Sequence, residues 1–218
     1  MDTSGAGKTA VVDIVVKIGG GVLAHADQFD AALDAIGVAG RERRLLVVPG
    51  GGPFADTVRD VDRRIKLADD AAHWMALLAM DQYAHLVASR LAGSVLVTKR
   101  HEIAAALDAP ARQIPVLAPF RWLHEADPLP HGWTVTSDSI SAWIAGRVDA
   151  RRLVLVKPPG AALQLPHGTG AMGFGETAQR AAAAELVDPY FPQALPAQVR
   201  FVMVSADQID ALKLALRG

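Results

Sequence analysis

The sequence predicts an α/β domain with a mainly parallel sheet and helices on both of its faces. Six short runs of aliphatic and β-branched residues have the composition of strands buried on both faces; they span residues 11–18, 45–48, 95–97, 114–117, 153–156 and 199–204. Helix-like segments lie between them, at residues 28–38, 53–66, 69–91, 103–107, 139–148, 177–186 and 206–216. This alternation is typical of parallel strands joined by helical crossovers.

Composition limits the classes of function. The 218 residues are 51% hydrophobic, enough to bury one large core, and show no internal repeat or linker. The net charge of −1 and the scattered basic residues argue against nucleic acid as a partner. No apolar run approaches the roughly 20 residues of a membrane span, so a cytoplasmic protein without a membrane partner is expected. The absence of cysteine and the irregular spacing of the seven histidines predict no metal site.

The first strand is flanked by two glycine-containing stretches that could each bind phosphate. Residues 5–9 resemble the end of a P-loop, but Asp2 stands where its first glycine belongs, and a strand follows instead of a helix. Lys17, in contrast, lies at the end of the strand and precedes three glycines at 19–21. Ligands of open α/β sheets gather beyond the carboxyl ends of the strands, and glycines let the backbone approach an anion. The second stretch is therefore the better phosphate site.

The second strand leads into Gly50, Gly51 and Gly52, and Pro53 then provides a favourable first residue for a helix. Free N–H groups and the positive end of the helix dipole make such a turn an anion site. A tight turn alone accounts for one or two glycines but poorly for three in a row. We therefore expect this turn to bind a ligand.

The helix expected at residues 69–91 opens on acidic residues, which favour a helix N-terminus. It is apolar over more than one face, with Trp74, Leu77 and Met80 among its large side chains. Two interpretations remain open at this point. The helix is either fully buried within one chain or shared with a second subunit.

Two polar elements follow in the second half of the chain. Residues 136–139, Thr-Ser-Asp-Ser, open the helix at 139–148, although capping a helix requires only one such residue. An acidic residue here could hold nearby lysine ammonium groups in position. Lys157 ends the strand at 153–156 and precedes a Pro-Pro-Gly turn, and the proline- and glycine-rich residues 157–175 and 188–196 are predicted loops.

In this order, the four elements resemble the amino acid kinase superfamily. Its pattern is a strand ending Lys-x-Gly-Gly, a strand followed by Gly-Gly-Gly, Thr-Ser-Asp opening a helix, and a strand that runs into a lysine turn ending in glycine. The resemblance covers most of the chain and implies a three-layer αβα sandwich. It also implies a single domain over residues 1–218, with an acceptor-side half at 11–130 and a nucleotide-side half at 131–218, and a homodimer or larger homo-oligomer formed through the helix at 69–91.

The resemblance further implies an ATP-dependent kinase, with Mg²⁺ carried in on the nucleotide phosphates. Lys17, Asp138 and Lys157 would be catalytic: Lys17 on the transferring phosphoryl group, Lys157 on the leaving β-phosphate, and Asp138 orienting both lysines. The residues implied to bind the nucleotide are Lys17, Gly19, Gly20, Ser137, Lys157 and Gly160, the first two glycines through their N–H groups. One departure is the turn at 158–160, where uridylate kinases have an aspartate before the glycine.

Within the superfamily, "VVPGGGPFADTVRDVD", the helix at 69–91 and "ELVDPYFP" are most similar to the archaeal-type aminomethyl-furanmethanol phosphate kinases. Bacterial relatives of these enzymes accompany tetrahydromethanopterin-linked C1 metabolism. The similarity implies a role in cofactor biosynthesis and a small-molecule acceptor that is itself a phosphate monoester. The residues implied to bind the acceptor are Gly50, Gly51, Gly52, Phe54, Arg59, His73 and Asp81.

His73 and Asp81 are the residues expected near the substrate amine, because positions two helical turns apart could share one face. A packed histidine and a solvated aspartate are the alternative interpretation of this pair. Two alternative functions also stay open. The first is a uridylate kinase or an acetylglutamate- or carbamate-type kinase, and the second is a non-catalytic nucleotide-binding or regulatory protein that retained the fold.

Overall fold

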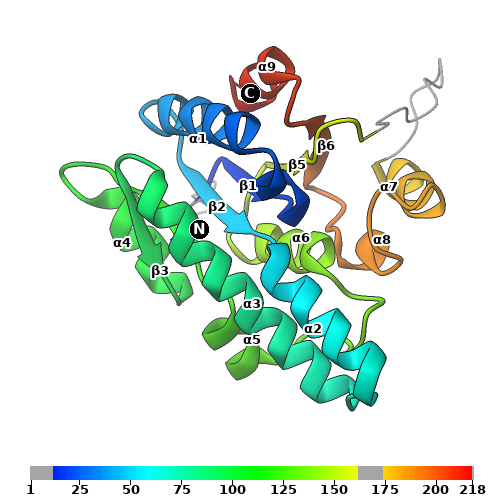
Figure 1. The fold of residues 1–218 in the computed structure, drawn as a ribbon. Coiled ribbons are helices and arrows are strands. Elements are labelled where there is room, and N and C mark those ends of the chain that lie inside the picture. Colours follow the sequence, from blue (N-terminus) through cyan, green and yellow to red (C-terminus); the bar gives the residue numbers. More distant parts are fainter. Residues whose placement is uncertain (1–11, 162–173, 218) are drawn as a thin grey trace, which may run out of the picture.

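The computed structural model describes residues 12–161 and 174–217 and is built around a six-stranded sheet (Figure 1). The strands are β1 (Ile14–Ile18), β2 (Leu45–Pro49), β3 (Ser94–Val97), β4 (Ile114–Leu117), β5 (Arg152–Lys157) and β6 (Arg200–Ser205). Their order in the sheet is β3-β4-β2-β1-β5-β6, and every neighbouring pair is parallel. The six predicted strands are confirmed, and the sheet is parallel throughout.

Seven helices correspond to the seven predicted segments: α1 (Ala26–Gly40), α2 (Gly52–Ile65), α3 (Asp69–Arg90), α4 (Arg100–Asp108), α6 (Ser137–Arg147), α7 (Phe174–Ala183) and α9 (Ile209–Arg217). Three short helices in the described residues were not predicted: η1 (Gly20–Ala24), α5 (Phe120–Ala126) and α8 (Phe191–Ala194). Segments of four to seven residues are too short to show a helical period of apolar residues. The prediction of a loop throughout 188–196 is wrong at α8.

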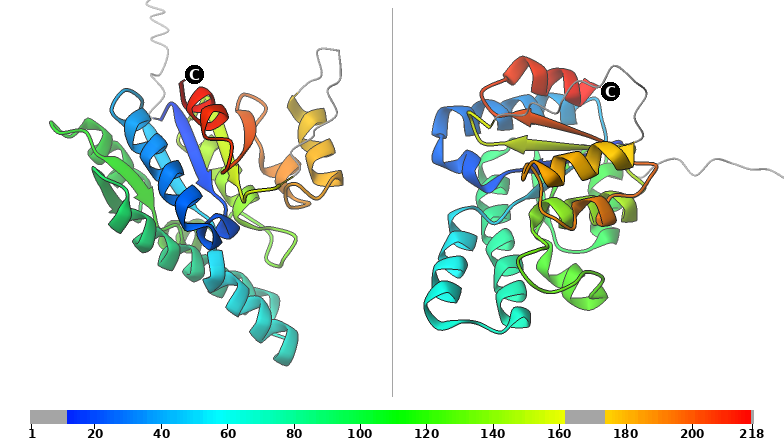
Figure 2. Two further views of the ribbon diagram at one scale, coloured as in Figure 1. Left: turned by 45° about the horizontal axis from the view of Figure 1, so that its top comes forward. Right: turned by 90° about the vertical axis from the view of Figure 1, so that its right-hand side faces the viewer.

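The sheet separates two layers of helices, as the three-layer prediction requires (Figure 2). The alternation of side chains along β1 illustrates the division. Ile14, Val16 and Ile18 enter a core cluster with residues of α1 and α9, whereas Val15 enters the opposite cluster with residues of α6 and α8. Lys17 has the same parity as Val15. The strand pattern therefore directs this lysine to the α6 side of the sheet.

Helices α2 and α3 form a pair that extends beyond the sheet (Figures 1 and 2). Much of α3 is buried, including Leu77, Tyr83 and Val87, but Met75 and Leu78 are exposed. The helix is therefore not fully buried within one chain, and its exposed apolar face leaves the interpretation of a helix shared with a second subunit open. In the two described ranges, no helix is long and apolar enough to cross a membrane.

Candidate active site

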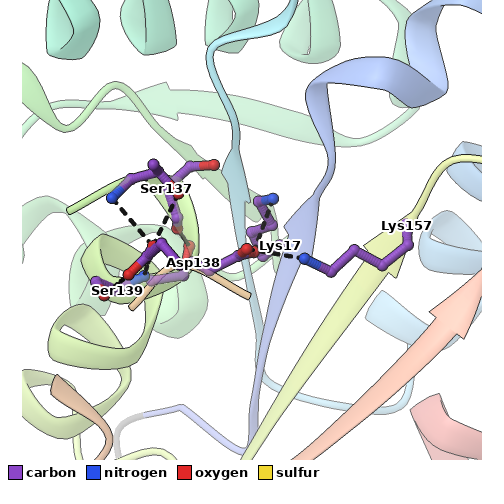
Figure 3. Close-up of polar contacts among 8 residues, drawn as sticks. Lys17, Ser137, Asp138, Ser139 and Lys157 are labelled. Atoms are coloured by element: carbon purple, nitrogen blue, oxygen red, sulfur yellow. Dashed lines mark hydrogen bonds and ion pairs between the residues drawn. The ribbon is translucent and has the colours of Figure 1, made fainter. Parts of the chain in front are cut away.

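Two lysines on neighbouring strands meet at the carboxyl edge of the sheet. Lys17 near the end of β1 is level with Leu155 of β5, so Lys157, two residues further along β5, lies on the same face. The first turn of α6 brings Asp138 between them (Figure 3). The Lys17 Nζ is 2.9 Å from Asp138 Oδ1, and the Lys157 Nζ donates to Oδ2 at 2.8 Å. We call these three residues the lysine clamp.

The lysine clamp is buried, which strengthens its electrostatics. The side chains of Lys17, Asp138 and Lys157 are only 5%, 8% and 11% exposed. Burial alone would raise the pKa of Asp138, but the two ammonium groups hold that pKa below its ordinary value. The pKa of Lys157 is lowered, first by burial and then by the charge of Lys17. With one carboxylate for two ammonium groups, the clamp keeps a net positive charge suited to an anionic ligand.

A second aspartate explains why four polar residues open α6. Asp188 is 8% exposed and accepts hydrogen bonds from the N–H and hydroxyl groups of both Thr136 and Ser139. These bonds satisfy the start of the helix from outside it, which is the function of an N-cap. The Asp138 side chain is thereby left available for the lysines. Asp188 lies 49 residues beyond Ser139, so no local pattern in the sequence pointed to it.

The two glycine turns pack directly against each other beside the clamp. A Cβ atom on Gly20 would lie 2.5 Å from the backbone nitrogen of Gly52, a separation that real Cβ atoms do not show. Gly52 has a φ of +57°, which favours glycine, and it lies over the ring of Tyr83. Gly50 approaches the Ser137 hydroxyl and the amide of Gly20. The structure thus brings the predicted nucleotide-side and acceptor-side glycines together at one point.

One predicted role needs correction. The Gly19 N–H already donates to the Val156 carbonyl at 2.8 Å, so it is not free to bind a phosphate as the resemblance implied. The next residue, Gly20, begins η1, and the first N–H groups of a helix have no partner within the helix. Gly160 has a φ of +75° in the turn after β5. The rejected P-loop at 5–9 and residues 162–173 of the predicted loop lie outside the described residues.

A pocket opens next to the clamp, between the α2–α3 pair and the segment leading into α6. Its lining residues are mostly apolar with a few polar side chains among them, the composition that is typical of small-molecule sites. At the clamp end it is lined by Gly51 and Ser137, and Met80, Arg59, Trp133 and His73 continue the lining. The pocket therefore joins residues from three distant parts of the chain.

Trp133 and Arg59 line one side of this pocket, and neighbouring aspartates hold both side chains in position. The Trp133 Nε1–H donates to Asp62 Oδ2 at 2.8 Å, which fixes the plane of the indole. The Arg59 guanidinium lies 4.9 Å from the centre of that ring and pairs with Asp56 at 2.7 Å. Arg59 was predicted as an acceptor residue, but Trp133 was not.

Four predicted acceptor residues are not among those that line the pocket: Gly50, Gly52, Phe54 and Asp81. The carboxylate of Asp81 accepts the Phe120 N–H at 3.0 Å and so supports the start of α5. Burial raises the pKa of Asp81 to about 6. Phe54 is half-buried and packs against two core clusters. Of the residues expected near the substrate amine, the structure brings only His73 to the pocket.

Comparison with known proteins places these features in a family. The model described as "Amino acid kinase family" matches residues 14–158, which include both glycine turns and the whole lysine clamp. The chain is 28% identical over 145 residues to the [5-(aminomethyl)furan-3-yl]methyl phosphate kinase of Methanocaldococcus jannaschii. That alignment covers 65% of this chain and 63% of the relative, so less than two thirds of the relative's length is matched.

Solved structures share the fold. The uridylate kinase of Archaeoglobus fulgidus matches with a TM-score of 0.67 at 12% identity, over 94% of this chain and 96% of that one. The UMP kinase of Ureaplasma parvum matches with a TM-score of 0.65 at 13% identity, over 93% and 95% of the two chains. At these identities the likeness concerns the fold alone, and it confirms the three-layer prediction.

Proposed function

Because the chain belongs to the amino acid kinase family, we propose that it is a phosphotransferase that moves the γ-phosphate of ATP onto a small acceptor. The observation that carries this proposal is the lysine clamp at the edge of a pocket. Two buried ammonium groups that share one carboxylate form a fixed positive centre. Catalysis of phosphoryl transfer is largely positioning and electrostatic stabilisation, and such a centre provides both.

The roles of the two lysines follow from the charges that change. When the bond between the γ-phosphorus and its bridging oxygen breaks, negative charge grows on the departing β-phosphate. In the proposal Lys157 stabilises that charge, while Lys17 stabilises the phosphoryl group in transfer. Asp138 holds both ammonium groups in place, so little reorganisation accompanies the reaction.

The nucleotide is proposed to lie against Gly20, Ser137 and the turn at Gly160. The N-termini of η1 and α6 both face this edge of the sheet, and helix N-termini favour phosphate. The Asp138 carboxylate is already committed to two lysines, so it is not offered to a metal. Mg²⁺ would therefore be held mainly by the nucleotide phosphates and water.

For the acceptor we propose an aminomethyl-furan phosphate monoester of the kind named for the Methanocaldococcus jannaschii relative. Its phosphate would enter at the clamp end of the pocket, near Gly51 and Ser137. Its flat ring would lie among apolar groups such as Met80 and Trp133. The acceptor phosphate oxygen then attacks the γ-phosphorus, and a diphosphate and ADP are formed.

The test is an acceptor panel. Purified enzyme with ATP and Mg²⁺ is offered the furan phosphate, UMP and N-acetylglutamate, and ADP release is followed together with ³¹P NMR of the product. Turnover of the furan phosphate to a diphosphate is expected. A clear preference for UMP would replace the proposed acceptor with the uridylate kinase alternative, and ATP binding without turnover of any acceptor would favour the non-catalytic one.

We also propose a homodimer, formed through α3. Met75 and Leu78 give this helix an apolar face that is exposed in the single chain. Exposed large apolar side chains on one helix face are typical of subunit contacts. The α3 face lies on the helix that also supplies His73 to the pocket, so assembly would stiffen the acceptor side.

A further inference from the structure

The far end of the pocket contains a buried polar side chain that forms no hydrogen bond to the part of the chain that the structure describes. His73 is only 6% exposed, and it lines the pocket. Within the described residues, its ring contacts Trp74 and His131. Its ring nitrogens are not among the fully buried atoms that lack a hydrogen-bond partner, so a water molecule or a ligand in the pocket can reach a nitrogen that the protein leaves free.

His73 is stacked on a second histidine that is held from both sides. The two rings lie 4.4 Å apart and are inclined by 16°. The Nδ1 of His131 is 2.6 Å from Asp70 Oδ1, and its Nε2 is 2.8 Å from Asp127 Oδ1. A carboxylate only accepts hydrogen bonds, so these two contacts favour the form of His131 in which both nitrogens carry a proton, the imidazolium. We call Asp70, His131 and Asp127 the histidine clamp.

At His73 the charge of His131 opposes a positive charge, whereas the carboxylates of Asp127 and Asp70 favour one. One imidazolium and two carboxylates give the histidine clamp a net charge of −1, the reverse of the lysine clamp. The hydrogen bonds to Asp70 and Asp127 raise the pKa of His131. Burial, and then the charge of His131, lower the pKa of His73 to about 4, so His73 is neutral at pH 7 and keeps a free lone pair.

The other charged and titratable groups nearby do not reverse this balance. Across the pocket, the Arg59 charge is offset by Asp56 and faces the Trp133 ring. His124 of α5 contacts Trp74, on the outer side of the aromatic group. A neutral imidazole beside a net negative clamp is a site for a hydrogen-bond donor that carries positive charge.

We infer that His73 accepts a hydrogen bond from an ammonium group of the acceptor, and that His131 is a positioning residue held against it by Asp70 and Asp127. This inference rests on the proposed function, since it gives the amine end of that acceptor a binding partner. The pocket then has two unlike ends: a positive end for the acceptor phosphate and a negative end for its amine. An acceptor with both groups would bind in one direction only.

The first experiment separates recognition of the amine from catalysis. Kinetics are measured with [5-(aminomethyl)furan-3-yl]methyl phosphate and with the same compound carrying a methyl group in place of the aminomethyl group. His73→Leu is expected to raise KM for the amine substrate roughly 10- to 100-fold, with kcat and KM for ATP little changed. KM for the methyl analogue should change little in this variant. His73→Gln, which keeps a hydrogen-bonding group, should recover part of the difference.

The matched control is His85→Gln, because His85 is an exposed histidine on the same helix. It should behave as wild type with both substrates. If His73→Leu weakens both acceptors equally, His73 has a packing role and the inference fails while the proposed function stands. If the wild-type enzyme has the same KM for the amine substrate and for the methyl analogue, the inference also fails. If wild type phosphorylates neither compound, both proposals fail.

The second experiment tests the histidine clamp without turnover. NMR titration of the free protein should show the His73 ring titrating with a midpoint near 4. In His131→Leu the midpoint should rise toward the ordinary 6.5, because a neighbouring positive charge is gone and two carboxylates are left unpaired. KM for the amine substrate should then increase as the pH falls from 8 to 6, unlike in wild type. A wild-type midpoint near 6.5, or no shift in the variant, would overturn the positioning role.

Discussion

The two clamps are electrostatic opposites, and each lies beside a residue that lines the pocket: Ser137 precedes Asp138, and His73 is stacked on His131. In the lysine clamp a carboxylate lies between two ammonium groups, and in the histidine clamp an imidazolium lies between two carboxylates. The first has a net charge of +1 and the second of −1. In each clamp, two groups of the same charge are held in place by one group of the opposite charge. Each clamp therefore has a small net charge in a fixed position, which suits a ligand with a positive and a negative end.

The clamps differ most in their exposure to water. All three side chains of the lysine clamp are nearly buried, whereas Asp70 and Asp127 are 78% and 58% exposed. Water and salt screen the exposed pairs, so each is expected to contribute little to stability. Removing one member of a buried ion-paired group instead leaves an uncompensated charge in the interior. Loss of one charged group should therefore destabilise the fold more in the lysine clamp than in the histidine clamp.

The largest effect is expected from Asp138→Asn. The neutral side chain no longer orients the two lysines, and kcat should fall by about 10²- to 10³-fold or more. Two buried ammonium groups also lose their shared partner, so the free energy of unfolding should drop by about 3–5 kcal/mol. Steady-state kinetics and urea denaturation at pH 7 measure the two losses separately.

Lys17→Met is the control that separates rate from stability. It leaves Asp138 and Lys157 as a neutral ion pair, so the fold should be less damaged than in Asp138→Asn. The rate should nevertheless fall by a comparable factor, because the positive charge on the transferring group is lost. Near-normal turnover in either variant would remove the clamp from the catalytic mechanism.

The resemblance to the amino acid kinases implied the lysine clamp, but nothing in the sequence pointed to the histidine clamp. Lys17 and Lys157 each end an apolar strand, and the structure makes these two strands parallel neighbours, so their carboxyl ends lie at one edge. His131 lies in an irregular segment. Its partner Asp70 lies in the first turn of α3, and its partner Asp127 directly follows α5. No period or motif connects such residues. Only tertiary packing brings them together.

The geometry of a helix explains why Asp81 does not line the pocket together with His73. Eight residues correspond to two helical turns plus about 80° of rotation, so His73 and Asp81 do not share one face of α3. The rotation turns Asp81 toward Phe120 while His73 faces the pocket. Asp188 was missed for a related reason. Its hydrogen bonds to the start of α6 join segments about 50 residues apart, and the four polar residues at 136–139 gave only half of the signal.

A smaller effect concerns the alkaline side of the pH–rate profile. The pKa of Lys157 is lowered by burial and by the charge of Lys17, so this ammonium group should lose its proton below the ordinary 10.5. We expect kcat/KM for ATP to fall with rising pH in that region, since kcat/KM reports groups of the free enzyme. In Lys157→Arg the guanidinium stays charged, and the decline should move to higher pH even if the overall rate is reduced. An unchanged alkaline limb in this variant would assign the decline to another group.

The smallest effect tests the exposed clamp. Because the folded-state pKa of His131 is raised, its charge stabilises the fold below the ordinary 6.5, and this contribution is lost as the pH rises through the folded value. Asp127→Asn removes one of the two carboxylates and should reduce the free energy of unfolding at pH 6 by no more than about 1 kcal/mol. Urea denaturation at pH 6 and pH 9 should show the difference only at the lower pH.

High salt provides a second test of the difference in exposure between the two clamps. The loss in Asp127→Asn should shrink in roughly 1 M NaCl, where the screening length is about 3 Å, whereas the loss in Asp138→Asn should persist because its partners are buried. If both losses responded to salt alike, the contrast between a buried and an exposed clamp would be wrong. If salt removes the loss of unfolding free energy only in Asp127→Asn, the difference in solvent exposure explains the result. The lysine clamp then contributes to the stability of the fold, and the main role proposed for the histidine clamp is to orient His73.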